Sequence, residues 1–433
     1  MKTFGTVVSI CDTRTRPAAL VLTVPILFLA LLVLPPGAQA QSFQVLHSFS
    51  GSSDGLQPYG GLTIDPAGRL YGTTLGADNC SPACGTVYRL AHHGSGWTFN
   101  TLYQFYDPTR GTSPASAVTI GPDGSLYGPA GGGLINGFCP EGCGVIFRLQ
   151  PPPAFCETVN CSWIESVVYS FQGCPNSFAG SGQVAFDTAG NIYGATPEGG
   201  DGCQGGSSPG GVYQLSHTGG NWNFQILYVF AGGYHDGCVP LGNVVVDRSG
   251  NIFGTTYECG SYFGAGIVYE VSPSGSNWIE SVLYPFGEIP HDGGEPFTGL
   301  TPDSAGNLFG VTPYGGANGA GEVFELSPSN GGYTYSVLYN NFTSTVGPIC
   351  RLALDSAGNV YGSQYLGGAN NDGLVFKLTP GSNGWTFTDL HDFSGTDGQY
   401  PIGDLAVDSA GNVYGTTKYG GNNGLGTVWQ ITP

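Results

Sequence analysis

Residues 408–417 read Asp-Ser-Ala-Gly-Asn-Val-Tyr-Gly-Thr-Thr, and versions of this stretch occur seven times in the chain. Each copy contains an aromatic residue followed by glycine, and the pairs are Tyr71-Gly72, Tyr127-Gly128, Tyr193-Gly194, Phe253-Gly254, Phe309-Gly310, Tyr361-Gly362 and Tyr414-Gly415. Successive pairs are 56, 66, 60, 56, 52 and 53 residues apart. A period of this size is typical of an array of similar structural units.

Each repeat predicts four β-strands. The Asp-Ser-Ala-Gly-Asn segment favours a tight turn, because the Asp side chain accepts from backbone N–H groups ahead of it and Gly tolerates positive φ. Short alternating runs flank the turn, as in 405–407 and 412–414, and predict a hairpin. A Gly-x-Val-aromatic-x-Leu run such as 373–378 predicts a third strand. A run that opens on Trp or Tyr and ends in Phe, such as 222–230, predicts the fourth.

The order of the strands predicts a closed ring. The segment 43–49 matches the fourth strand of a repeat, as in 385–393, and the chain ends directly after the third strand of the seventh repeat. We therefore expect 43–49 to pair with 426–431 and to complete the last unit. The predicted fold is all-β, a single seven-bladed β-propeller over residues 41–433 with four strands per blade.

Residues 1–40 have the layout of a secretory signal peptide. Three basic residues, Lys2, Arg14 and Arg16, precede the apolar run 19–34, and Ala38-Gln39-Ala40 suits cleavage after Ala40. The alternative is an uncleaved membrane anchor, but a run of this length falls short of the roughly twenty residues that span a bilayer. We expect a secreted, periplasmic or cell-surface protein without a membrane segment after cleavage.

The mature chain is strongly acidic. The full sequence has 11 basic and 30 acidic residues. Residues 1–40 hold three of the basic and one of the acidic residues, so 8 and 29 remain, a formal charge of −21. Such a surface repels nucleic acid and anionic lipid, which excludes both as partners. We expect a monomer.

The repeats resemble the GloVer tandem repeats of bacterial exported proteins. The segments 283–286, 292–296, 303–310 and 315–328 together give one nearly complete unit, and the resemblance covers nearly all of residues 43–433. It implies a repeat fold and export, often with a surface anchor, but no particular chemistry. Because the sequence ends at Pro433 without an apolar tail, cell-wall attachment is not expected.

The eleven mature cysteines predict disulfides in an oxidising compartment. Zinc is the alternative for closely spaced cysteines, but the exported context and the separation of the pairs in different blades favour oxidation. Cys350 is expected to be free and buried. The expected bridges are Cys80–Cys84, Cys139–Cys143, Cys156–Cys161, Cys174–Cys203 and Cys238–Cys259.

The loops between fourth and first strands and between second and third strands are expected on one face, opposite the Asp-Ser-Ala-Gly-Asn turns. This loop-rich face differs from blade to blade, as ligand specificity requires. His-Asp pairs on it could act in acid–base catalysis or bind Ca²⁺. The alternative for each Asp is turn chemistry, because each begins an Asp-Gly-x-x-Pro segment.

Two classes of function follow from these features. The first, which we favour, is a non-catalytic exported propeller that binds a carbohydrate or an extracellular protein without a cofactor. The second is a secreted hydrolase or lyase of a polysaccharide or lactone with a His/Asp site at the propeller mouth, so whether the protein is an enzyme stays open. The predicted ligand-binding residues lie in blades 3 to 5: His235, Asp236, Glu258, Tyr262, His291 and Asp292.

Overall fold

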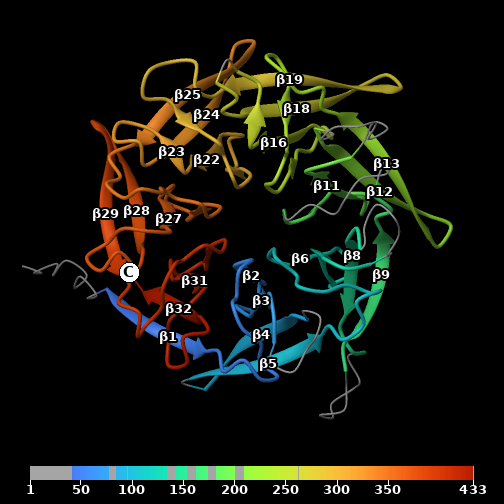
Figure 1. Ribbon diagram of the computed structural model, residues 1–433, viewed down its shortest axis with the longest axis vertical. Coiled ribbons are helices and arrows are strands. Elements are labelled where there is room, and N and C mark those ends of the chain that lie inside the picture. The colour runs from blue at the N-terminus through green and yellow to red at the C-terminus, as the bar shows by residue number, and fades with distance from the viewer. Residues whose placement is uncertain are drawn as a thin grey trace, which may run out of the picture. The chain divides into compact units, whose positions relative to one another are not determined.

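A computed structural model describes residues 41–77, 84–94, 96–133, 142–153, 162–173, 182–199, 209–261 and 263–432. Residues Gln41–Pro433 form one compact unit, and the predicted signal peptide lies outside the described residues. The described residues form seven four-stranded antiparallel sheets arranged as the blades of a propeller (Figure 1). The predicted fold class is therefore confirmed. No helix in the described ranges is long and apolar enough to cross a membrane.

Each blade contains one strand of each of four kinds, and the blades are numbered 1 to 7 in chain order. The innermost strands are β2 (Leu62–Ile64), β6 (Thr119–Ile120), β10 (Ala185–Phe186), β15 (Val245–Val246), β21 (Thr301–Pro302), β26 (Ala353–Leu354) and β30 (Ala406–Val407). The second strands are β3 (Leu70–Thr74), β7 (Leu126–Ala130), β11 (Ile192–Thr196), β16 (Ile252–Thr256), β22 (Leu308–Thr312), β27 (Val360–Gln364) and β31 (Val413–Thr417). The third are β4 (Thr86–His93), β8 (Val145–Gln150), β12 (Gly211–Thr218), β18 (Ile267–Ser274), β24 (Glu322–Ser329), β28 (Leu374–Gly381) and β32 (Thr427–Thr432). The outermost are β5 (Gly96–Gln104), β9 (Ile164–Ser170), β13 (Asn221–Val229), β19 (Asn277–Pro285), β25 (Gly332–Tyr339), β29 (Gly384–Asp392) and β1 (Ser42–Ser48).

The first strand of the chain closes the ring. β1 pairs with β32 in antiparallel register from Ser42 opposite Thr432 to Ser48 opposite Thr427. In Figure 1 the blue β1 lies beside the red β32, so blade 7 combines both ends of the propeller. The predicted pairing of 43–49 with 426–431 is confirmed.

A carboxylate network fixes the repeated turn. In blade 6, Oδ1 of Asp355 accepts from the backbone N–H groups of Ala357 and Asn359, each at 2.9 Å. Its Oδ2 accepts from Asn359 Nδ2 at 2.7 Å and from the Tyr361 hydroxyl at 2.9 Å. Gly358 has the positive φ of 79° that the turn requires. The repeated sequence pattern thus joins the turn to the aromatic residue of the second strand.

Both faces of the second strands are buried, because each blade packs between two neighbours. Across five of the seven junctions, a Tyr or His of one outermost strand stacks on an aromatic ring of the next. The ring centroids lie 3.6–4.6 Å apart in the pairs His391–Phe43, Tyr284–Tyr335, His47–Phe99, Tyr339–Phe387 and Tyr169–Phe224. Each such pair contributes about 0.5–1.5 kcal/mol beyond area burial.

Acidic residues replace the ring at the other two junctions. Between blades 1 and 2, buried Glu165 forms an ion pair with Arg110 at 2.6 Å and is also approached by the Tyr103 hydroxyl. Between blades 3 and 4, Glu280 faces Asp236 instead of a cation, and burial together with Asp236 raises the pKa of Glu280 to about 7. The first junction therefore pairs opposite charges, whereas the second brings two carboxyl groups together.

Glycine allows the inner strands to approach one another at the axis. A Cβ on Gly182 would lie 2.3 Å from the carbonyl oxygen of Gly242, and one on Gly299 would lie 2.0 Å from that of Asn243. Any side chain at these positions would push neighbouring blades apart. The axial residues are thereby brought close enough to line shared cavities.

Candidate functional site

The two kinds of loop that were expected on one face pair with each other in blades 4 and 5. In blade 4, β14 (Gly237–Cys238) of the loop before the first strand pairs with β17 (Glu258–Cys259), which follows the second strand. In blade 5, β20 (Gly293–Gly294) pairs with β23 (Tyr314–Gly315) in the same manner. The two kinds of loop therefore emerge together.

The two predicted aspartates of this face point into their own loops. Asp236 is only 8% exposed, and its Oδ2 accepts from the Tyr228 hydroxyl at 3.0 Å and from the backbone N–H of Ala231. Asp292, also 8% exposed, accepts from the Tyr284 hydroxyl at 2.9 Å and from the backbone N–H of Gly287. Burial raises the pKa of Asp292. Both carboxylates hold a loop onto the outermost strand.

The remaining predicted residues do not converge with these carboxylates. His235 and His291 are exposed, and His235 contacts the ring of Tyr234. Glu258 is exposed on β17, and Tyr262 lies outside the described residues. Within the described ranges no group of three His, Cys, Asp or Glu residues has the geometry of a metal site. The ligand-binding role of the six residues stays a prediction.

The cysteines follow the predicted pattern where they are described. Cys238 and Cys259 form a disulfide that joins β14 to β17. Cys350 is free and buried, as expected. Cys84 and Cys143 are also disulfide-bonded. The other cysteines of the predicted bridges lie outside the described residues: Cys80, Cys139, Cys156, Cys161, Cys174 and Cys203.

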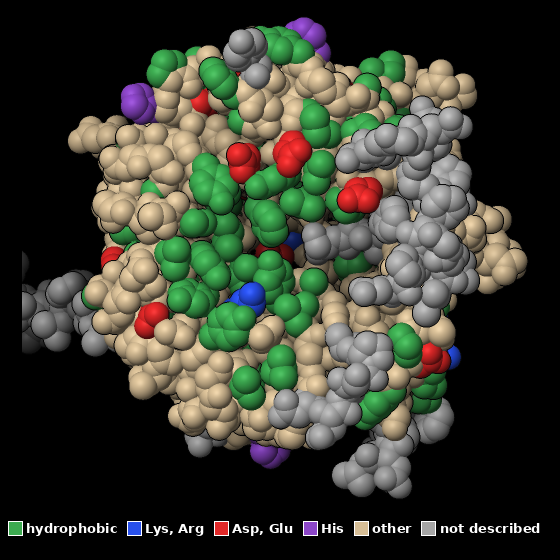
Figure 2. All heavy atoms as spheres, in the orientation of Figure 1, with side chains coloured by type: hydrophobic (Ala, Val, Ile, Leu, Met, Phe, Trp, Pro, Cys, Tyr) green, Lys and Arg blue, Asp and Glu red, His purple; other side chains and the backbone are tan. Residues whose placement is uncertain are grey.

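An aromatic cavity of about 260 Å³ opens near the axis, and we call it the mouth. Its walls come mainly from two positions of the repeat, the residue after the loop proline and the first residues beyond the second strand, and Val346 adds to them from the loop before Pro348. On the face shown in Figure 2, hydrophobic side chains gather around the centre of the ring. The lining residues are Tyr59, Tyr257, Phe297, Pro313, Tyr314, Val346, Ile349, Tyr365 and Ile402.

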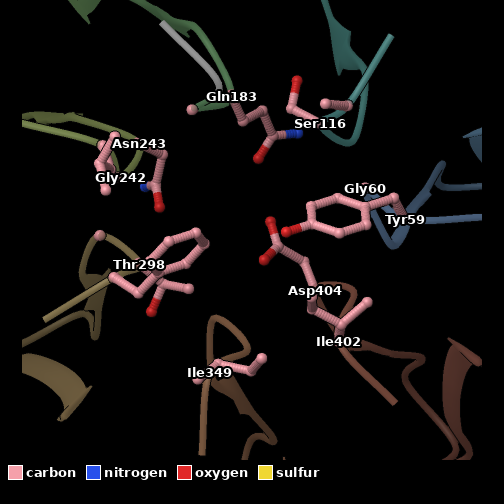
Figure 3. A pocket seen from close by; sticks show the side chains of 15 residues that line it. Tyr59, Gly60, Ser116, Gln183, Gly242, Asn243, Thr298, Ile349, Ile402 and Asp404 are labelled. Atoms are coloured by element: carbon pink, nitrogen blue, oxygen red, sulfur yellow. The ribbon is translucent and has the colours of Figure 1, made fainter. Parts of the chain in front are cut away.

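A smaller cavity of about 60 Å³, the throat, continues from the mouth along the axis and has a more polar lining than the mouth. The two cavities share Tyr59, Phe297, Ile349 and Ile402 in their linings. Figure 3 shows residues with polar side chains from six blades around the throat, and the Tyr59 hydroxyl and the Asp404 carboxylate point into it. These residues are Tyr59, Ser116, Gln183, Asn243, Thr298 and Asp404.

A bond between opposite blades forms the floor of the throat. Nη1 of Arg351 in blade 6 donates to Oε1 of Gln183 in blade 3 at 2.6 Å. Nε2 of Gln183 donates in turn to the carbonyl of Val118 at 2.7 Å. A second cavity, of about 330 Å³, lies beyond and is lined by Arg351 and by inner-strand residues. The axial channel is thus divided into two compartments.

Asp404 supplies the carboxylate of the throat. Its Oδ1 accepts from the backbone N–H of Arg351 at 3.2 Å, and no described residue donates to its Oδ2. Burial raises the pKa of Asp404, although the Arg351 charge acts in the opposite direction. At the rim, burial and then the neighbouring Glu295 raise the pKa of Tyr257 to about 12. The site therefore combines a neutral aromatic rim with one acidic group at depth.

An open groove adjoins the mouth on the blade 4 side. Glu258 and Glu295 lie in its lining together with Tyr257, which also borders the mouth. Phe263 contributes a ring that is 75% exposed. One of the six predicted residues, Glu258, therefore borders this groove.

The sequence held a signal for the mouth that our prediction did not use. The residue after each loop proline is Tyr59, Phe297, Ile349 or Ile402 in blades 1, 5, 6 and 7 but Ala115 in blade 2. Large apolar residues at these positions lie at the axis, where they line one cavity together with residues of other repeats. Only the closed ring brings them together.

A family model, described as the Gloeobacter/Verrucomicrobia repeat, matches residues 36–206, 141–351 and 334–433. The chain belongs to this Gloeobacter/Verrucomicrobia repeat family. The matches extend over the whole propeller, which agrees with the resemblance found in the repeats. No curated protein matches the chain in sequence.

Solved structures similar to this member of the repeat family share its fold at low identity. PorZ, an essential surface component of the type-IX secretion system of Porphyromonas gingivalis, matches with a TM-score of 0.50 and 13% identity over 89% of this chain and 48% of PorZ. The chain thus spans about half the length of PorZ. A fungal alcohol oxidase of the AA5 family, solved with copper, gives a TM-score of 0.51 and 11% identity over 87% and 74% of the two chains. A candidate 6-phosphogluconolactonase from Bacteroides uniformis gives a TM-score of 0.51 and 14% identity over 80% of this chain and 88% of the lactonase chain.

Proposed function

We propose that the protein is an exported propeller that binds a carbohydrate through the mouth on its loop-rich face. The observation that carries the proposal is the aromatic lining of the mouth above a polar throat. A sugar ring has an apolar face that packs on aromatic rings and an edge of hydroxyls that needs hydrogen-bond partners. Small-molecule sites are mostly apolar cavities with a few placed polar groups, which matches this arrangement.

The size of the site suits one or two sugar units. Ligand cavities commonly measure about 300–1,000 Å³, and the mouth alone encloses about 260 Å³. The adjoining groove with Glu258 and Phe263 offers room for a further unit. The predicted signal peptide and the repeat family both favour export to a compartment where glycans are encountered.

The carboxylates of the mouth and the throat favour binding without hydrolysis. Glycosidases use two carboxyl groups about 5–10 Å apart across the scissile bond. Among the described residues that line the mouth and the throat, Asp404 is the single carboxylate. His235 and His291 are both exposed rather than held against a carboxylate of either cavity. The hydrolase or lyase alternative therefore has less support in the mouth and the throat, and two other nearby carboxylates, Glu258 and Glu295, lie in the adjoining groove.

A glycan array tests this function with the mature protein. We expect wild type to bind one glycan class, and Tyr257→Ala and Tyr365→Ala to weaken that binding about threefold to tenfold each, the value of a lost ring contact. Tyr106→Ala is the matched control, because Tyr106 is 73% exposed and lies outside the mouth. A parallel array with a chelator tests the expectation that no Ca²⁺ is needed. Binding to no glycan, or equal binding by the mouth variants, would refute the proposal.

A further inference from the structure

The throat admits only a small group from the loop-rich face. Its volume of about 60 Å³ corresponds to roughly four to six water positions at about 10–15 Å³ each. A sugar ring fits the mouth above but not the throat. One exocyclic or terminal group of a bound sugar can therefore enter the throat while the ring stays between the tyrosines.

The floor prevents a polymer from passing through the ring. The Arg351–Gln183 hydrogen bond crosses the axis, and Gln183 is held by Val118 from a third blade. Because both partners are engaged, opening the floor would leave polar groups unsatisfied in a buried place, which is costly. A glycan that enters along the axis must end there.

The depth of the throat holds an acceptor that is free to bind a ligand donor. Oδ1 of Asp404 is used by the backbone of Arg351, whereas Oδ2 has no donor among the described residues. Figure 3 shows the carboxylate and the Tyr59 hydroxyl both pointing into the cavity. Gln183 and Asn243 present their amides from the opposite side. Because the Gln183 amide is already bonded to Arg351 and Val118, a ligand hydroxyl placed here has the Asp404 carboxylate as its acceptor and the Tyr59 hydroxyl beside it.

We propose that the site binds the terminal residue of a glycan end-on, with one hydroxyl of that residue donating to Asp404 in the throat. This inference rests on the proposed function and adds the part of the glycan that is recognised. Internal segments of a polysaccharide are excluded by the closed floor and the size of the throat.

The first test compares chain lengths of one glycan. For the class bound on the array, affinity is measured by calorimetry for the hexasaccharide and for the polymer of the same linkage. End-on binding predicts the same dissociation constant for both probes when concentration is counted in chain ends. When concentration is counted in sugar units, the polymer should therefore bind more weakly than the hexasaccharide, in proportion to its length. A constant affinity per sugar unit would overturn end-on binding but leave carbohydrate binding intact. If neither probe binds, the proposed function itself fails.

The second test addresses Asp404 with the same hexasaccharide. Asp404→Asn keeps the shape of the side chain, and we expect at least about tenfold weaker binding, the usual loss for a hydrogen bond to a charged group. Asp107→Asn is the matched control, because Asp107 is exposed in a loop of the same face. The melting temperature of the variant is measured alongside to show that it folds. If Asp404→Asn does not fold, end-on binding is tested by the chain-length comparison, which needs no variant. Unchanged affinity in a folded Asp404→Asn protein would remove Asp404 from the site.

Discussion

Glu322 has a buried carboxyl group with too few hydrogen-bond donors around it, and its ionisation should lower the free energy of unfolding. The residue is fully buried on β24. Its Oε1 accepts from the Tyr335 hydroxyl and from the backbone N–H of Gly293, while Oε2 has no partner among the described groups. Burial, opposed by the Tyr335 bond and reinforced by Asp292, raises the pKa of Glu322 from 4.5 to about 7.

The sign of the effect follows from proton linkage. Between about pH 4.5 and pH 7 the unfolded chain has lost the proton that folded Glu322 retains, so the free energy of unfolding falls as pH rises. At ~1.4 kcal/mol per pH unit, the full difference between 4.5 and about 7 corresponds to about 3 kcal/mol. The Glu322→Gln variant cannot ionise and should lack this loss.

The assay is thermal unfolding of wild type and Glu322→Gln at pH 5 and pH 8. With an unfolding entropy of ~2 cal/mol/K per residue, roughly 390 residues give about 0.8 kcal/mol/K, so about 3 kcal/mol corresponds to about 4 °C. Part of the loss has already occurred at pH 5, so we expect the variant to gain about 2.5 kcal/mol, or about 3 °C, relative to wild type between pH 5 and pH 8. Glu325→Gln on the same strand is the control. An equal difference between variant and wild type at both pH values would refute the reasoning.

Three further predictions concern the ring and its loops. Deletion of residues 41–50 should lower the melting temperature steeply, because it exposes the edge of β32; an unchanged melting temperature would contradict ring closure. Replacing Cys238 and Cys259 by Ala should cost about 3 kcal/mol of unfolding free energy in urea, the value for a closed loop of 21 residues, and an equal midpoint for both proteins would argue against this. Arg110→Ala should cost about 2–3 kcal/mol by leaving Glu165 unpaired, less than for a fully buried pair because the Arg110 side chain is 46% exposed. Adding Glu165→Gln should recover most of that loss, and a double variant no more stable than Arg110→Ala would count against the ion pair.

The fold was predictable because its determinants are local and repeated. The turn of Asp355 is built by residues within six positions of it, and the same bonds recur at Asp187 and Asp408. A seven-fold repetition of one pattern makes each strand recognisable even where a single copy is weak. The match between 43–49 and the fourth strands then implied closure.

The site was less predictable because its residues are neither local nor repeated. His235 and Asp236 are neighbours in sequence, but the carboxylate turns inward to Tyr228 while the imidazole stays in solvent. A sequence cannot show this difference in direction within a turn. The Arg351–Gln183 bond joins residues 168 positions apart, and it depends on the number of blades between them.

The bond across the axis also bears on how such a propeller can change in evolution. Arrays in which each unit touches only its neighbours tolerate gain or loss of a unit, because every interface is equivalent. Arg351 and Gln183 instead act as a cross-brace between blades that are not adjacent. One blade more or fewer between them would change the angle at which the two side chains face each other. Duplication and deletion of repeats in this ring are therefore constrained by two residues at its centre.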